Sequence, residues 1–169
     1  MRIIISDTSC LIDLRKAALL AVFLRLPFEV LIPNTLFEDE LLNFSVEEKM
    51  SLVKAGLTVV DLSGKQVSRA RDVIRAQPRL NIHDGFAFTL AETHPGCILL
   101  TGDSGLRALA ERSQIEVHGI LWVCDRLLES ELATAERLRA AVSKLAADRA
   151  VRLPKRELAA YIRRYQSQG

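Results

Sequence analysis

The chain has 169 residues, of which 49% are hydrophobic and 26% are charged, and its formal net charge is +2. This length matches one domain, and the composition is typical of a globular protein and excludes a disordered or fibrous one. The longest strongly apolar stretch, residues 17–24, is far shorter than the roughly 20 residues of a membrane-spanning helix. Because only three isoleucines precede Asp7, there is no room for a secretory signal, and we expect a cytoplasmic protein.

Short apolar runs that end in polar residues predict five strands along the chain. Runs of this kind, rich in Val, Ile and Leu, are typical of parallel strands that are buried on both faces. Pro33 ends the second of them, because proline cannot continue inside a central strand. The predicted strands are 2–6, 30–32, 58–62, 97–101 and 115–120, the last of them at an edge of the sheet.

Helices are predicted between these strands and throughout the C-terminal part. Asn34 or Thr35 is expected to cap a helix that carries Leu36, Phe37, Leu41 and Leu42 on one apolar face, with Glu40 also on that helix. Ser45 and Glu48 have the spacing of a capping box. The other predicted helices are 10–26 as one helix or a broken pair, 46–55, 65–76, 81–91, 106–112, 122–129, 133–147 and 155–165.

Strands that alternate with helices predict an α/β fold in three layers, with a central parallel sheet of about five strands and helices on both faces. We expect a single domain, 1–169, in which residues 122–169 form a helical C-terminal extension. Residues 132–169 carry nine Lys and Arg against three acids, whereas residues 1–131 carry 14 against 18. This basic tail suits a polyanionic substrate beside an acidic pocket, or it is simply a solvated helix face.

Four acids, Asp7, Glu40, Asp84 and Asp103, each stand where a strand-like run ends or a helix starts. Because the carboxyl ends of parallel strands share one edge of the sheet, we expect these acids to meet in one pocket. Oxygen ligands of this kind suit Mg²⁺ or Mn²⁺, and clustered carboxylates repel one another unless a cation is present. Such a site can activate water for phosphodiester hydrolysis.

Other interpretations of the same residues stay open. Each Asp, taken singly, is a common helix cap. Glu38 competes with Glu40 because both lie near the same helix turn, although Glu40 adjoins the apolar face and is preferred. The three cysteines lack the paired spacing of a thiolate metal site and are expected to be core thiols. Among the histidines, only His83 is expected to reach the pocket.

The motifs around these acids resemble the PIN-domain ribonucleases, in particular the VapC toxins of toxin–antitoxin pairs. The resemblance covers roughly the first three quarters of the chain and rests on four segments in the family's order. Gly85 departs from the family, which often has a larger residue there, and the helical tail is longer than in its smallest members. The four segments are 3–14 (IIISDTSCLIDL), 32–41 (IPNTLFEDEL), 82–91 (IHDGFAFTLA) and 99–107 (LLTGDSGLR).

This resemblance implies Mg²⁺- or Mn²⁺-dependent cleavage of single-stranded RNA, homodimerisation, and inhibition by a small cognate antitoxin whose tail occupies the catalytic groove. It assigns the metal to Asp7, Asp84 and Asp103, gives Glu40 a role in metal binding or water orientation, and makes Ser9 and Thr101 supports of the carboxylates.

Four other classes of protein are less consistent with the chain. A haloacid-dehalogenase-type phosphatase needs an acid two residues after its nucleophile, where this chain has Ser9, and a receiver domain needs a paired acid and a late lysine. No dinucleotide-binding or P-loop glycine motif is present. A non-catalytic PIN-like module that binds RNA or protein is the remaining alternative, and the presence of all four acids weighs against it.

Overall fold

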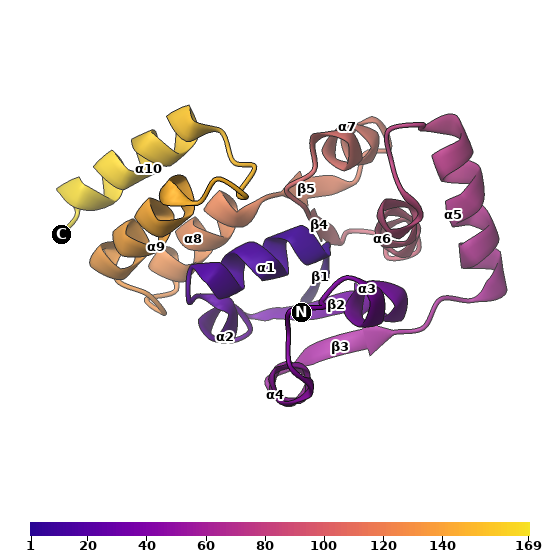
Figure 1. Cartoon of the computed structure of the whole chain (residues 1–169), viewed down its shortest axis with the longest axis horizontal. Helices are drawn as coiled ribbons and strands as arrows, with labels where there is room; N and C mark the ends of the chain where they lie inside the picture. Colours follow the sequence, from indigo (N-terminus) through magenta and orange to yellow (C-terminus); the bar gives the residue numbers. More distant parts are fainter.

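The computed structural model describes residues 1–169 and contains one five-stranded sheet with helices around it (Figure 1). The strand order is β3-β2-β1-β4-β5, and every neighbouring pair is parallel. The prediction of an α/β fold with a parallel sheet of five strands is therefore confirmed, with the fifth strand at an edge. The strands are β1 (Arg2–Ser6), β2 (Phe28–Pro33), β3 (Leu57–Val60), β4 (Ile98–Leu100) and β5 (Glu116–His118).

Helices connect the strands and fill the C-terminal part. Because crossovers between parallel strands are right-handed, the helices that follow β1 and β2 cover one face and those that follow β3 and β4 cover the other. The helices are α1 (Thr8–Lys16), α2 (Leu20–Phe23), α3 (Asn34–Asp39), α4 (Val46–Lys54), α5 (Gly64–Ala76), α6 (Ile82–Glu92), α7 (Ser104–Arg112), α8 (Ile120–Glu129), α9 (Ala135–Ala147) and α10 (Lys155–Ser167).

Three helices in the first half, α4, α5 and α6, start with a capping box. The predicted box before α4 is present, since the Glu48 backbone N–H donates to the Ser45 hydroxyl at 3.0 Å and Glu48 Oε2 accepts from the Ser45 N–H at 2.8 Å. A second box joins Asn81 and Asp84 at the start of α6, with both hydrogen bonds at 2.9 Å. These caps satisfy backbone N–H groups that have no partner inside the helix.

The helix after β2 differs from the prediction. It starts at Asn34, directly after Pro33, and neither Asn34 nor Thr35 caps it with a side chain. It ends at Asp39, so Glu40 follows the helix instead of lying on it, and Leu42, predicted for the apolar face, is 78% exposed. The prediction extends the helix too far, because α3 has only six residues and its apolar face ends with Phe37 before the chain turns away.

Residues 10–26 form the broken pair that the sequence allowed. Ala18 lies between α1 and α2 with a positive φ of 56°, a conformation that ends a right-handed helix. The Leu19 N–H then donates to the Leu14 carbonyl at 2.8 Å, which closes the end of α1.

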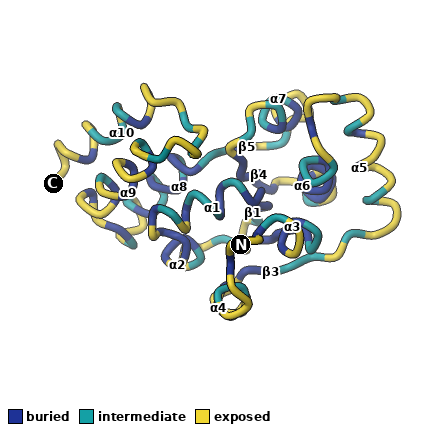
Figure 2. Tube along the Cα trace, in the orientation of Figure 1, coloured by how far each residue is buried: buried dark blue, intermediate teal, exposed yellow.

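The C-terminal helices share one apolar core with the sheet, a cluster of 49 buried residues that runs from Ile4 to Tyr165. Figure 1 shows α8, α9 and α10 beside α1 and α2, at the opposite end of the molecule from α5, and Figure 2 shows α5 mostly exposed. Asp125 of α8 anchors α10, because its carboxylate accepts hydrogen bonds from Tyr161 at 2.9 Å and Tyr165 at 3.2 Å and pairs with Arg164.

The three cysteines, Cys10, Cys97 and Cys124, are buried and unpaired, as predicted for core thiols. Burial raises the pKa of the Cys10 thiol well above its ordinary value, so it is a poor nucleophile. None of the helices combines the length and apolar character needed to cross a membrane.

Candidate functional site

Asp7 lies at the centre of the candidate site because it follows the central strand, β1. Ser6 is paired in register with Leu100 of β4, so the next residues, Asp7 and Thr101, lie side by side at the carboxyl ends of the strands. The Asp7 side chain is only 6% exposed, and its Oδ2 accepts hydrogen bonds from Thr101 at 2.8 Å and Ser9 at 3.1 Å. The two residues predicted to support the carboxylates therefore both donate to the same oxygen.

Asp103 is tied to the same network through the turn after β4. Its backbone N–H donates to the Thr101 hydroxyl at 3.0 Å, and the Gly102 N–H donates to the Ser9 hydroxyl at 3.3 Å. The Asp103 carboxylate caps α7 by accepting from the Leu106 N–H at 2.8 Å. One carboxylate oxygen is thus used by the helix, and the other remains for a ligand.

Glu40 reaches Asp7 through Thr8, a residue that was not singled out in the sequence. The Thr8 hydroxyl donates to Glu40 Oε1 at 2.9 Å and lies 3.3 Å from Asp7 Oδ1, and having one hydrogen it can donate to only one of them at a time. The signal for Thr8 was its place between Asp7 and Ser9 in one polar run. Glu38 is exposed and lines a different hollow beside α4.

Asp84 faces the same space from the first turn of α6. Burial, together with the negative charges of Asp7, Asp103 and Glu40, raises its pKa to about 6, although the Asn81 N–H opposes this shift by bonding to the ionised form. Charges act on one another in this way only when the carboxylates lie close together. The fold therefore brings the four acids, which the sequence separates by up to 96 positions, near enough for their charges to act on Asp84.

His83 lies at the rim of this acidic site, where the sequence placed it. Its Nδ1 is 3.9 Å from Glu40 Oε2, and its Nε2 is 3.3 Å from Asp39 Oδ2. Burial raises the pKa of Glu40, whereas the hydrogen bond from Thr8 and the nearby His83 lower it. Glu40 thus combines partial burial with both a hydroxyl and an imidazole neighbour, as suits a group that orients a water molecule.

The four acids fit a hard divalent cation in their chemistry, since all donors are carboxylate oxygens and their mutual repulsion is relieved by positive charge. No three Asp, Glu, His or Cys side chains in the chain are close enough to surround one ion. Mg²⁺ does not need such a cage, because it usually keeps several waters and takes one or two carboxylates together with substrate phosphates.

Gly85, which departs from the expected pattern, serves helix packing and not the acidic site. A Cβ atom at this position would lie 3.0 Å from both the Ala70 carbonyl oxygen and Ile74 Cγ2 of α5. Only glycine lets α6 approach α5 this closely. The close approach fixes where the first turn of α6, with Asp84, lies relative to the sheet.

We compared the sequence with models of known protein families. A family model described as a PIN domain, DUF3368, matches residues 3–167. The chain belongs to the PIN-domain family. The matched region of this PIN domain includes all four acids and nearly the whole C-terminal extension, so the extension is part of the family pattern. A PIN domain is a nuclease-type fold, which agrees with a hydrolase. The search of curated proteins gave no match.

Proposed function

We propose that this PIN domain is a Mg²⁺- or Mn²⁺-dependent endoribonuclease that cleaves single-stranded RNA with a metal-activated water. The observation that carries the proposal is the hydrogen-bond network that joins Asp7 to Glu40 through Thr8 and to the Asp103 backbone through Thr101, with Asp84 near enough for the charges of these acids to raise its pKa. A protein gains nothing in stability from such an arrangement, whereas a bound cation would turn the repulsion into attraction.

In this proposal Asp7, Asp84 and Asp103 hold the metal, one or two of them directly and the rest through its bound waters, and Glu40 holds metal or orients the attacking water. The ion, when bound, supplies an activated water and neutralises charge on the phosphate. Thr101 and Ser9 both donate to Asp7 Oδ2 and so limit rotation of the carboxylate. Oδ1 then keeps a fixed direction and free lone pairs for a cation.

Cleavage of labelled single-stranded RNA by the purified protein tests this function directly. We expect cutting with Mg²⁺ or Mn²⁺, none with chelator, and a loss with Asp7→Asn that exceeds about 100-fold, the upper end of losses caused by groups behind the metal ligands. Tight binding of RNA or protein without metal-dependent cutting would instead support the non-catalytic binding module.

We also propose that the protein acts as the toxin of a toxin–antitoxin pair in the cytoplasm, with an antitoxin whose tail occupies the groove beside the acids. This role rests on the resemblance of the four acidic segments to VapC toxins. Expression of the chain should arrest growth, Asp7→Asn should not, and co-expression of a small DNA-binding protein encoded directly upstream should restore growth. Continued growth with the wild-type chain would contradict it.

We further propose that the protein forms a homodimer through α4. Apart from Met1, the large apolar residues that are exposed all lie on or just before this helix, namely Leu42 at 78%, Val46 at 69%, Met50 at 63% and Val53 at 49%. The first turn of α4 is acidic and its last turn carries Lys54. Two copies packed antiparallel along α4 would bury the apolar face and place opposite charges together.

A further inference from the structure

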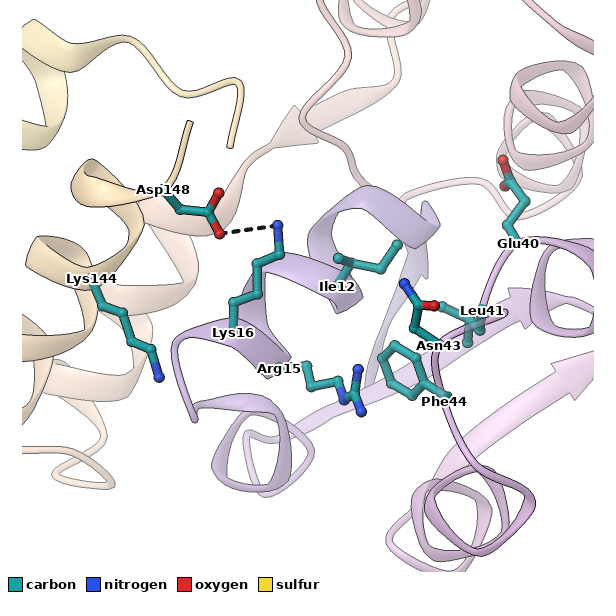
Figure 3. Close-up of a pocket in the computed structure, with 9 residues that line it drawn as sticks. All are labelled: Ile12, Arg15, Lys16, Glu40, Leu41, Asn43, Phe44, Lys144 and Asp148. Carbon is teal, nitrogen blue, oxygen red and sulfur yellow. Dashed lines mark ion pairs between the residues drawn. The ribbon is translucent and has the colours of Figure 1, made fainter. Parts of the chain in front are cut away.

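Two hollows lie next to each other over α1, between the candidate site and the C-terminal helices. The first, of about 330 Å³, reaches from Glu40 to Lys144 of α9 (Figure 3). The second, of about 230 Å³, reaches from Ser9 and Asp103 to Arg152 in the connection between α9 and α10. Ile12 and Lys16 line both, so the hollows adjoin each other at α1, and each is lined by at least one of the candidate acids.

Four basic side chains line these hollows, and two of them have no partner. Arg15 pairs with Glu48 at 2.8 Å, and Lys16 pairs with Asp148 at 3.2 Å. Lys144 and Arg152 are exposed, and they form no ion pair or side-chain hydrogen bond. Their charges are therefore available to an anion that enters the hollows.

The position of these two cations is held by contacts between the C-terminal extension and α1. The Lys16–Asp148 ion pair joins α1 to the end of α9, and the Arg137 guanidinium donates to the Ala18 carbonyl at 3.0 Å. Asp148 also accepts from the Ala150 N–H at 2.8 Å, which fixes the turn that leads to Arg152. The extension is thus tied across α1 at two places, so its cations stay beside the hollows.

We propose that Lys144 and Arg152 bind two phosphates of a single-stranded RNA chain in the two hollows beside the acidic site. The choice of RNA rests on the proposed function. A free phosphate or a mononucleotide would fill one hollow, whereas two unpaired cations in two adjoining hollows match a polyanion with several phosphates. Because the acids repel phosphate, the substrate needs positive charge next to them, and the extension supplies it.

The salt dependence of RNA binding tests this inference without relying on cleavage. Fluorescence anisotropy of a labelled single-stranded oligoribonucleotide, measured in chelator, compares the wild type with Lys144→Gln/Arg152→Gln over a range of salt concentrations. Each phosphate contact contributes about 0.7 to the slope of log Kd against log salt for single strands, so the slope should fall by about 1.4. Both residues are exposed, and a melting curve checks that the variant is folded.

Arg156→Gln/Arg163→Gln is the matched control, because it removes the same charge from exposed residues of α10 outside both hollows. Its slope of log Kd against log salt should equal that of the wild type. Suppose that the wild type cuts RNA and that the salt slope falls equally in both double variants or stays unchanged in both. Either result would overturn the inference and leave the nuclease proposal intact. A wild type that neither binds nor cuts RNA would overturn both. If the protein cuts no RNA but the salt slope falls only in Lys144→Gln/Arg152→Gln, the result would support the RNA-binding site and not the nuclease proposal.

Discussion

Thr101 is the residue on which the geometry around Asp7 most directly depends, since its hydroxyl donates to the Asp7 carboxylate and accepts from the Asp103 backbone N–H. Thr101→Val keeps the shape of the side chain but removes both hydrogen bonds. Leaving a buried polar group without its partner costs about 1–3 kcal/mol, so we expect the free energy of unfolding in urea to fall by that amount. Thr101→Ser retains the hydroxyl and should lose much less. Equal losses of stability in the two variants would show that packing of the side chain, and not its hydrogen bonds, determines the effect.

Asp84 makes the stability of the metal-free protein depend on pH. Its pKa is about 6 in the folded chain and has the ordinary value of 3.8 in the unfolded chain. Between these values the folded state keeps a proton that the unfolded state has lost, so stability falls as pH rises from about 4 to 6 and stays lower above.

Asp84→Asn should therefore stabilise the protein in chelator at pH 7.5 by about 1–2 kcal/mol, less than the full shift implies because the group is partly exposed. The asparagine oxygen can still accept from the Asn81 N–H, so the capping box is kept. Thermal melts at pH 7.5 and pH 4 measure this, and the gain should vanish at pH 4. A gain that is the same at both pH values would contradict the raised pKa of Asp84.

The acids also show why single residues were ambiguous in the sequence. The interpretation of Asp103 as a helix cap is correct, and Asp84 takes part in a capping box. Neither role prevents a carboxylate from facing the other acids, because a cap uses only one oxygen. Thr8 could not be found by spacing, since its importance depends on Glu40, 32 positions away.

At the scale of elements, the packing of α6 on α5 decides where Asp84 lies. Gly85→Ala places a methyl group 3.0 Å from the Ala70 carbonyl oxygen, a backbone atom that cannot move alone. Overpacking costs about 1–3 kcal/mol, and the better helix propensity of alanine returns about 1 kcal/mol, so we expect a net loss of stability. Urea unfolding measures it. Gly64→Ala is the control, because a Cβ there meets nothing within 4 Å.

The elements themselves were largely predictable, and their errors lie at boundaries. Hydrophobic runs located all five strands, most clearly β1, β2 and β4 in the middle of the sheet, because strands buried on both faces are continuously apolar. The predicted third strand, 58–62, is Leu57–Val60, since Asp61 begins the polar segment before α5. The short helix α3 was extended too far because Leu41 and Leu42 continue the apolar spacing, whereas only Leu41 is buried.

At the scale of the whole molecule, metal binding should raise the melting temperature. A ligand that binds only the folded state stabilises it by about 1.4 kcal/mol at ten times its Kd. Millimolar Mg²⁺ or Mn²⁺ should therefore shift the thermal melt upward, and Asp103→Asn, which can still cap α7, should reduce the shift. An unchanged melt across millimolar metal would count against the site.

The α4 surface makes a second prediction at this scale. Met50→Glu places a charge in the middle of the exposed apolar face, so sedimentation should show a monomer where the wild type is a dimer. Arg163→Glu, on the exposed surface of α10, should leave the dimer intact. A wild-type protein that sediments as a monomer at high concentration would exclude this interface.

The sequence by itself determined the strands, most helices and the positions of the four acids, because these depend on local hydrophobic patterns and on polar residues that end them. Only the tertiary structure decided that Thr8 bridges Asp7 and Glu40, that Gly85 sets the spacing of α5 and α6, and that Lys144 and Arg152 reach across α1. Each of these depends on contacts between residues far apart in the chain, which no local pattern records.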